Sequence, residues 1–435
     1  MRQRGRHRRR RRGRALRAAL TGAALGLTAA ATLISASQAT VAEDPGALKP
    51  LAASARSEEL RLTEQRVPQP WLDRLSAVMG EPVGVGTVLD TADRPLREAA
   101  DCTDDERQAL PVAPAATRAY CWDEGETRGW QAGAVTTSGD ADDDGRWGSR
   151  RVILSAWSRE DQTPGAGLAR VSFVDADDPE NLSYTSALLT VPVEGGNDYR
   201  GLDSPVTGMV WYQDKLLVTT GDRDRNALYV YDVDRVQRAT TDTDAVGRVP
   251  GGWAAHGCRY VLPAVAAYRL PDVPGAARPE VLSLDRGTFP SSLVAGEWVA
   301  ADEGRPTRLW RYALSTEPER AGLPAADRAG HVDAREAYET EAVEVGGVLS
   351  YRPTGADRSR WYLGRAATGT EGRGTLWRQD ATGSRTTTCG ADRSHQCWSA
   401  LPGSLSYWAE TGEVWSQTGR VLFALPLAAV EKALD

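Results

Sequence analysis

The chain has few of the side chains that enzymes most often use as bases, nucleophiles or metal ligands. Its 435 residues include four histidines, three lysines and five cysteines, and the histidines do not cluster. No Gly-x-Ser-x-Gly, Ser-x-x-Lys or His-Glu-x-x-His sequence is present. The spacings of cysteine and histidine do not suit zinc. The sequence therefore gives little evidence for a catalytic centre or a zinc site.

Basic residues are also scarce once the N-terminal segment is set aside. The whole chain has 52 basic and 59 acidic residues, and ten of the arginines lie in residues 1–17. Without that segment, 52 − 10 = 42 basic residues face 59 acidic ones, which gives a net charge near −17. Such a surface repels phosphate backbones, so we expect no nucleic-acid partner.

The N-terminal segment has the pattern of an export signal. An arginine-rich stretch is followed by an apolar run at residues 18–34, and small residues then offer cleavage sites ending at Ala39 or Ala42. We therefore expect residues 1–42 to be a signal peptide and the protein to be secreted. An uncleaved signal that anchors the protein at the membrane is the alternative. No other segment is long and apolar enough to span a bilayer, so the mature protein is expected to have no membrane span.

Cysteines of an exported protein are expected to form disulfides. Pairing of sequence neighbours predicts Cys102–Cys121 and Cys389–Cys397, each closing a short loop. Cys258 would remain unpaired and buried.

Residues 43–129 are expected to form an N-terminal arm with little sheet. Helices are predicted in "SEELRLTEQ", residues 57–65, and in "PWLDRLSAVMG", residues 70–80, because Pro68 and Pro70 break the pattern between them. The segment between the first two cysteines is predicted to be an irregular loop that its disulfide holds.

From residue 130 to residue 435 the pattern changes to short apolar strands separated by Gly, Pro and Asp turns. Groups of about four strands recur, and small sheets that repeat along a chain are typical of a β-propeller. We predict an all-β propeller of about five blades, within a range of five to seven. The segment "VGVGTVLDT", residues 83–91, is a candidate for a ring-closing strand. A β-sandwich is the alternative fold.

Four segments carry a resemblance to known sequences: "WQAGAVTTSGDA", "ARVSFVD", "GMVWYQDKLLVTTG" and "ALYVYDVDRV". They are similar to segments of uncharacterised secreted proteins of actinobacteria, and the likeness extends from Trp130 to Pro426. The resemblance implies an exported protein with propeller-like repeats and implies no known activity. Relatives often have a His-Ala-Gly-Gly element before the "VWY" run, whereas "SPVTGMVWY" has no histidine here, so no role of that histidine is carried over.

The stretch "DADDDG" places acidic residues at alternate positions. The carboxylates of Asp140, Asp142 and Asp144 fit the start of a calcium loop. The ninth and twelfth positions counted from Asp140 are Gly148 and Arg151, where calcium loops have acidic ligands. An exposed acidic turn between two strands of a blade is the favoured alternative, and calcium stays a candidate cofactor.

Aromatic residues in predicted loops are the best candidates for ligand contact. They are Trp147, Trp253 and Trp398, and His256 is added as a loop histidine. Because the sequence contains no nucleophile motif, we expect a monomeric module that binds an extracellular protein or glycan at its central face. The alternative function is a secreted hydrolase or lyase that uses carboxylates, with or without calcium. A surface protein held by an uncleaved signal is a third hypothesis.

Overall fold

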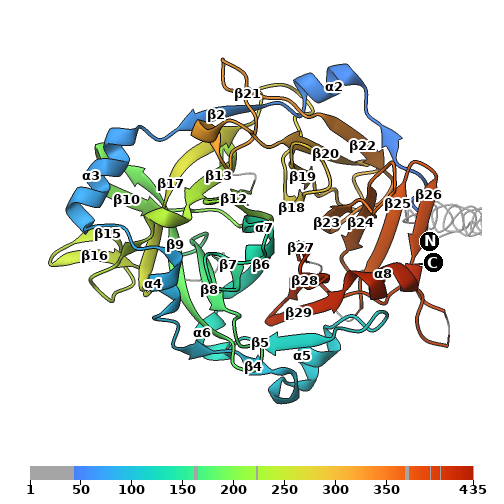
Figure 1. Cartoon of the computed structure of the whole chain (residues 1–435), viewed down its shortest axis with the longest axis horizontal. Helices are drawn as coiled ribbons and strands as arrows, with labels where there is room; N and C mark the ends of the chain where they lie inside the picture. The colour runs from blue at the N-terminus through green and yellow to red at the C-terminus, as the bar shows by residue number, and fades with distance from the viewer. Residues whose placement is uncertain are drawn as a thin grey trace, which may run out of the picture.

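The computed structural model describes residues 44–434, except 161–164, 222–223, 368–371, 392 and 402. Small antiparallel sheets surround a common axis as the blades of a propeller (Figure 1). The predicted all-β propeller is confirmed, and the strand pairing divides it into five blades. The predicted signal peptide lies outside the described residues.

The first two blades are joined into one 13-stranded sheet. The first blade consists of β6 (Trp130–Thr137), β7 (Val152–Arg159), β8 (Ala169–Asp175) and β9 (Ser183–Val193). The second consists of β11 (Met209–Tyr212), β12 (Lys215–Thr219), β13 (Asn226–Asp232) and β17 (Tyr260–Arg269). The first part of β17 pairs in parallel with β9, and its second part pairs with β13, so this long strand connects the two blades at their outer edge.

The other three blades are separate sheets. The third consists of β18 (Val281–Asp285), β19 (Ser292–Gly296), β20 (Thr307–Ala313) and β22 (Glu336–Thr340). The fourth consists of β23 (Val345–Tyr351), β24 (Arg360–Arg365), β25 (Thr375–Asp380) and β26 (Gly383–Thr386). The fifth consists of β27 (Ser406–Trp408), β28 (Glu413–Thr418), β29 (Val421–Pro426) and β5 (Arg118–Cys121).

Short elements complete the loops and the rim. The strands among them are β4 (Arg97–Glu98), β10 (Asp198–Gly201), β14 (Gln237–Arg238), β15 (Val246–Val249), β16 (Gly252–Ala255) and β21 (His331–Val332). The helices are α4 (Val85–Leu89), α5 (Asp104–Gln108), α6 (Glu124–Thr127), α7 (Ser138–Ala141) and α8 (Leu427–Leu434). None of the described helices has the length and apolar character needed to cross a bilayer.

The blade strands are apolar on both faces because each blade packs against two neighbours. Successive residues of β7 illustrate this, since Ile153 packs into the interface with the fifth blade and Leu154 into the interface with the second. A large aromatic side chain lies in each interface between neighbouring blades. These residues are Trp211, Trp310, Trp361, Trp398 and Trp408, all at most 3% exposed. Burying each such side chain stabilises the ring, which explains why the sequence is rich in tryptophan.

Residues 44–121 form a belt around the outside of the ring, here called the N-terminal belt (Figure 1). The N–H of Leu48 donates to the carbonyl of Asp380 in the fourth blade. After that contact, β1 (Lys49–Pro50) pairs with β22, β2 (Leu62–Arg66) with β17, and β3 (Arg94–Pro95) with β9. Finally β5 pairs with β29 and completes the fifth blade. The N-terminal belt therefore contacts every blade.

Two predictions for the N-terminal belt need correction. The first predicted helix, residues 57–65, is instead the end of α2 (Ala53–Glu58) followed by β2, because pairing with β17 overrides the local helical pattern. The predicted closing strand at residues 83–91 is wrong, since residues 85–89 form α4 and β5 closes the ring. The second predicted helix is confirmed as α3 (Gln69–Met79).

Candidate functional site

A pocket of about 260 Å³ lies on the axis of the propeller, at the end where the innermost strands begin. Residues from all five blades line it, because β6, β11, β18, β23 and β27 converge there. The lining side chains that matter most are Gln131, Thr207, Glu280, Trp298, Leu401 and Gln417. A site to which every blade contributes can exist only when the ring is complete.

Two glycines that line this pocket, Gly133 and Gly403, lie very close to neighbouring backbone. A Cβ atom on Gly133 would lie 1.9 Å from the carbonyl oxygen of Val206. A Cβ on Gly403 would lie 2.5 Å from the carbonyl oxygen of Gln417. Such distances exclude any side chain, so only glycine lets the innermost strands approach this closely. The wall of the pocket is therefore closely packed backbone at these two positions.

Two large apolar side chains in the pocket are exposed. Trp298, in the loop that follows β19, is 39% exposed, and Leu401, which precedes β27, is 58% exposed. Other tryptophans of the blades are buried, so the exposure of Trp298 is not a consequence of the fold alone. An exposed indole in a concave site is typical of ligand binding.

Polar groups beside Trp298 are held in place by hydrogen bonds. The backbone N–H of Trp298 donates to Oε2 of Glu280 at 2.5 Å. The hydroxyl of Thr207 donates to the backbone carbonyl of Glu280 at 2.6 Å. The amide oxygen of Gln417 accepts a hydrogen bond from Ser155 at 2.6 Å. Because their orientations are set before any ligand arrives, these groups can give the pocket specificity.

The opposite end of the axis has a buried carboxylate that does not line a described pocket. Asp140, on α7, is 3% exposed, and its Oδ2 accepts hydrogen bonds from Thr136 at 2.8 Å and from Ser406 at 2.7 Å. Burial raises the pKa of Asp140 to about 6, although these two hydroxyls and the charge of Arg286 oppose the rise. Asp140 therefore connects neighbouring blades.

The structure does not assemble the predicted calcium loop. Asp142 and Asp144 are exposed, whereas Asp140 turns inward to Thr136 and Ser406. The carboxylates of Asp142 and Asp144 accept backbone hydrogen bonds from the residues that follow them. Among the described residues, the oxygen atoms of these three carboxylates do not all come within 4.8 Å of one another, as ligands of one metal ion would. The loop is a short helical turn followed by an exposed acidic stretch.

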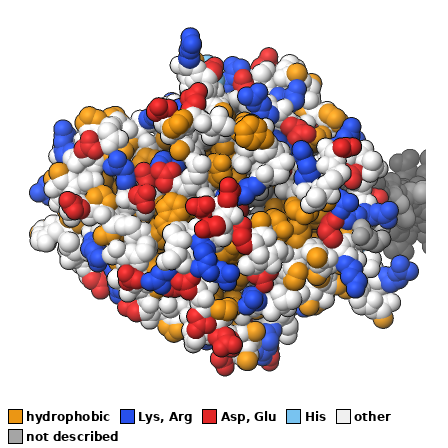
Figure 2. Space-filling view, viewed as in Figure 1, with side chains coloured by type: hydrophobic (Ala, Val, Ile, Leu, Met, Phe, Trp, Pro, Cys, Tyr) orange, Lys and Arg blue, Asp and Glu red, His pale blue; other side chains and the backbone are white. Residues whose placement is uncertain are grey.

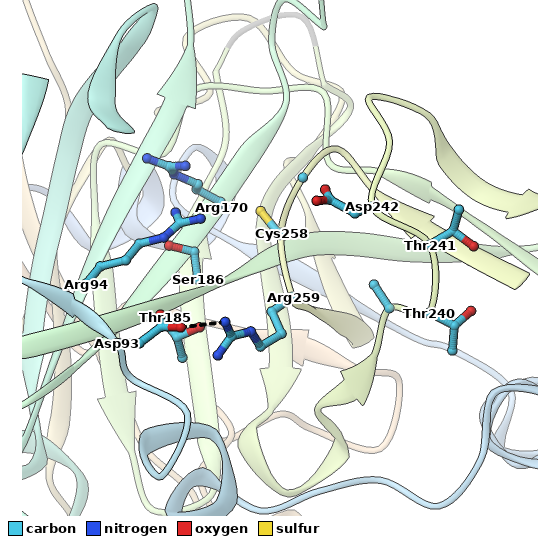
Figure 3. Close-up of a pocket in the computed structure, with 12 residues that line it drawn as sticks. Asp93, Arg94, Arg170, Thr185, Ser186, Thr240, Thr241, Asp242, Cys258 and Arg259 are labelled. Atoms are coloured by element: carbon cyan, nitrogen blue, oxygen red, sulfur yellow. Dashed lines mark hydrogen bonds and ion pairs between the residues drawn. The ribbon is translucent and has the colours of Figure 1, made fainter. Parts of the chain in front are cut away.

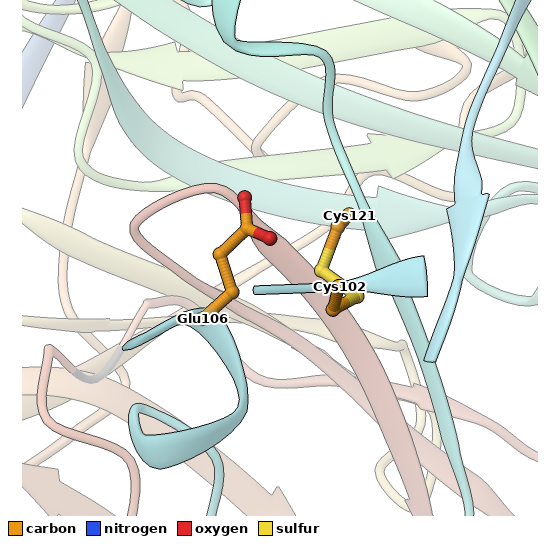
Figure 4. A group of neighbouring side chains, drawn as sticks. All are labelled: Cys102, Glu106 and Cys121. Atoms are coloured by element: carbon orange, nitrogen blue, oxygen red, sulfur yellow. A yellow bond between two sulfur atoms is a disulfide. The ribbon is translucent and has the colours of Figure 1, made fainter. Parts of the chain in front are cut away.

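Two other groups have the composition of metal sites, and the structure gives each a different explanation. In the first, Cys102 and Cys121 form a disulfide beside Glu106 (Figure 4), so their sulfur atoms are not available as thiolate ligands. Glu106 itself pairs with Arg97 at 2.9 Å and completes the capping box of α5. Burial opposes its ionisation, but hydrogen bonds from Thr103 and Arg97 hold the pKa of Glu106 below its usual value.

The second group consists of Asp214, Asp232 and Asp234. The ammonium of Lys215 pairs with Asp214 and lies 3.2 Å from Asp232. This acidic cluster has the ligands for a metal ion, but a lysine of the same strand pair already supplies positive charge there. Burial and the two neighbouring carboxylates raise the pKa of Asp234.

Two of the predicted ligand-contact tryptophans are buried. Trp253 lies on β16 rather than in a loop, is 6% exposed and stacks on Tyr199 with ring centroids 5.5 Å apart. Trp398 is 1% exposed and packs edge-on against Phe423. Both are core residues and neither is placed to meet a ligand.

The other two candidates are partly accessible but do not line the axial pocket. Trp147 is half-buried against Trp211, with ring centroids 5.1 Å apart. His256 has a left-handed backbone, φ 50°, and its Nδ1 lies 2.8 Å from the carbonyl of Asp244. None of the four predicted residues lines the axial pocket. Trp298, which was not among these candidates, lines it and is 39% exposed.

Both predicted disulfides are confirmed, and Cys258 is a buried free cysteine as expected. The first disulfide connects the start of α5 to β5, the strand that closes the ring. The second closes a loop between β26 and β27.

Comparison with known proteins gives no family. No family model and no curated protein matches the chain. Among solved structures, it is similar to a gluconolactonase from Xanthomonas campestris, with 13% identity, 80% of this chain and 98% of that chain covered, and a TM-score of 0.29. It is also similar to a chain in the structure of Drosophila plexin A in complex with semaphorin 1b, with 10% identity, 75% of this chain and 77% of that chain covered, and a TM-score of 0.24. At these scores the matches give no information about activity.

Proposed function

We propose that the protein is an exported binding module that holds the end of a neutral glycan in its axial pocket without converting it. The observation that carries this proposal is the exposed indole of Trp298 in a pocket shared by all five blades. The apolar face of a sugar ring stacks on an indole, and its hydroxyls then need polar partners at the edge of the ring.

The rest of the pocket supplies such partners. The exposed amide of Gln131 can donate and accept hydrogen bonds, and the exposed hydroxyl of Thr207 can accept them. Glu280 brings the only charge among the described lining residues, and it is negative. A carboxylate repels acidic sugars, so the pocket favours a neutral sugar or one that carries an amino group.

The two disulfides support an extracellular location, because such bonds persist in oxidising compartments. The arginine-rich leader of residues 1–42 agrees with it. In this setting a soluble glycan-binding protein would meet polysaccharides of the cell's surroundings.

Binding is favoured over hydrolysis because of the carboxylates. Most glycoside hydrolases use a pair of carboxylates on either side of the bond that breaks. The described lining of the axial pocket contains one, Glu280, and the perturbed Asp140 lies at the other end of the axis. A calcium requirement is not part of the proposal.

The test is calorimetric titration of the mature protein with neutral oligosaccharides, compared with the Trp298→Ala variant. We expect the substitution to weaken binding about tenfold or more, since the stacking surface is lost. Phe289→Ala is the matched control, because Phe289 is 96% exposed and lies outside the pocket. Binding that Trp298→Ala leaves intact would refute the site.

Recovery of the oligosaccharides after long incubation tests the absence of catalysis. We expect them unchanged by chromatography. Turnover that Glu280→Gln abolishes would replace the binding proposal with the hydrolase alternative.

A further inference from the structure

A second pocket, also of about 260 Å³, lies away from the axis between the outer parts of the first two blades. Its walls come from β8, β9, the segment around β3 and the segments on either side of the β15–β16 hairpin (Figure 3). Three arginines, Arg94, Arg170 and Arg259, contribute to these walls. Two aspartates, Asp93 and Asp242, also line the pocket, so the basic lining residues outnumber the acidic ones by one.

Arg170 is the most deeply placed of the three and is 6% exposed. Its guanidinium lies over the ring of Trp130, 4.2 Å from the centroid, and Nη2 donates to the carbonyl of Glu126 at 2.9 Å. Its Nε is buried and has no hydrogen-bond partner. Across the described residues, Arg170 makes no ion pair with a carboxylate, although the charge of Glu126 acts on its guanidinium.

The other two arginines have their own carboxylates. Arg94 pairs with Glu126 at 2.5 Å, and Arg259 pairs with Asp93 at 2.7 Å. Figure 3 shows Arg259 turned toward Asp93, while the guanidinium groups of Arg94 and Arg170 lie on the same side of the pocket as the thiol of Cys258. Arg170 therefore has no carboxylate of its own, because the nearby Glu126 carboxylate already pairs with Arg94.

A buried cation without a counter-ion is costly to the folded state. A cation–π contact with Trp130 offsets only part of this cost. Burial lowers the pKa of Arg170, and the charge of Arg94 lowers it further, whereas Cys258, Tyr184 and Glu126 oppose the fall. An anion in the pocket would offset part of the cost of burying this cation.

We propose that this pocket binds a small hydroxylated molecule through an oxyanion group, a carboxylate or a phosphate, which Arg170 holds with help from Arg94. A planar guanidinium presents parallel N–H groups that match the oxygens of either anion. The hydroxyls of Thr185, Ser186 and Thr241 and the carboxylate of Asp242 line the same pocket and suit the hydroxyl groups of such a ligand.

This site is independent of the axial pocket, whose described lining carries a carboxylate and no basic residue. The two sites therefore call for ligands of different charge. A protein that fails to bind neutral glycans could still bind an oxyanion at this site. A protein that fails to bind oxyanions could still bind neutral glycans in the axial pocket.

The experiment is calorimetric titration of the mature protein with two probes, inorganic phosphate and glucuronate. The expected result is saturable binding of at least one probe, and the tighter of the two identifies the class of oxyanion. Arg170→Lys keeps the charge but loses the planar pair of donors, and we expect it to weaken binding about tenfold. Arg94→Gln, which removes a half-buried cation, is expected to have an effect in the same direction.

Arg238→Met is the matched control. Arg238 also lies over an aromatic ring, that of Tyr260, at 5.6 Å from the centroid, but it does not line the pocket. We expect the Arg238→Met variant to bind the probe as tightly as the unmodified protein does. Near-ultraviolet circular dichroism of each variant shows whether the fold is retained. The proposal is overturned if neither probe binds, or if Arg170→Lys and Arg94→Gln, both folded, bind the probe as tightly as Arg238→Met.

Discussion

The carboxylate of Asp140 accepts a 2.7 Å hydrogen bond from the hydroxyl of Ser406, 266 residues further along the chain. The same oxygen accepts a hydrogen bond from the hydroxyl of Thr136. That hydroxyl in turn accepts a hydrogen bond from the backbone N–H of Trp211. These contacts connect the fifth, first and second blades through one buried group. The network crosses the place where the ring closes.

Asp140 should make stability depend on pH. Its pKa is raised to about 6 in the folded protein, against about 3.9 for an exposed aspartate. Between these values the folded state binds more protons than the unfolded state, so the contribution of this group to stability falls as the pH rises from about 4 to about 6.

We expect the stability of the native protein, relative to Asp140→Asn, to fall by on the order of 2 kcal/mol between pH 4 and pH 7. Urea unfolding of both proteins across this range measures it. Asp142→Asn changes an exposed neighbour and should leave the pH profile of the native protein unaltered. Parallel profiles for Asp140→Asn and the native protein would show that this carboxyl does not titrate in that window.

Arg311 donates a hydrogen bond to Ser350 of the fourth blade at 3.0 Å, so it should be essential to the packing of the third blade against the fourth. It pairs with Asp285 at 2.7 Å, and their side chains are 4% and 1% exposed. Arg311→Met leaves that carboxylate buried without its cation, and we expect a loss of about 3 to 5 kcal/mol in the free energy of unfolding. Arg61→Met, at an exposed pair with Asp333, should cost less than about 1 kcal/mol. Equal losses in denaturant titrations would contradict this assignment.

Replacing a glycine at the axis should destabilise the folded protein, whereas replacing a glycine with open space around it should not. The Cβ of Gly133→Ala would clash with backbone 1.9 Å away, so the innermost strands must separate, and we expect a loss of at least about 1 to 3 kcal/mol. Gly86→Ala lies in α4 with open space around it and should be neutral or slightly stabilising. Thermal unfolding of the two variants decides the matter, and equal melting temperatures would argue against a closely packed axis.

The two disulfides should differ in importance. Loop closure alone gives about 3 kcal/mol for Cys102–Cys121 and about 2.5 kcal/mol for Cys389–Cys397. The first bond also anchors β5 in the fifth blade, so replacing its cysteines with alanine is expected to lower the melting temperature more. The comparison needs both double variants under identical conditions, and a larger loss from the second pair would reverse the order.

The ring could be predicted from sequence because the constraint on its strands is local and repeated. Both faces of a blade are buried, so residues such as Ile153 and Leu154 are apolar in succession, and turns separate the strands at regular intervals. The disulfide partners were predictable for a similar reason, since each pair closes a short stretch of chain.

The candidate site was not predictable because its features depend on contacts distant in sequence. Asp140 belongs to an acidic pattern that suits a calcium loop or an exposed turn, yet Ser406 on another blade accounts for where its carboxylate points. Trp253 follows two glycines and suggests a loop, but the β15–β16 hairpin folds it onto Tyr199. Leu62 belongs to a helical pattern, and the free strand edge of β17 changes it to a strand. Nothing in the local sequence distinguishes Trp298 from the buried tryptophans.

The N-terminal belt makes the order of synthesis matter. Its residues leave the ribosome before the blades with which they pair, and β5 meets its partner only when residues 421–426 have been made. The ring therefore cannot close until β29 has been synthesised, so the first part of the chain waits for one of the last strands before the fifth blade is complete.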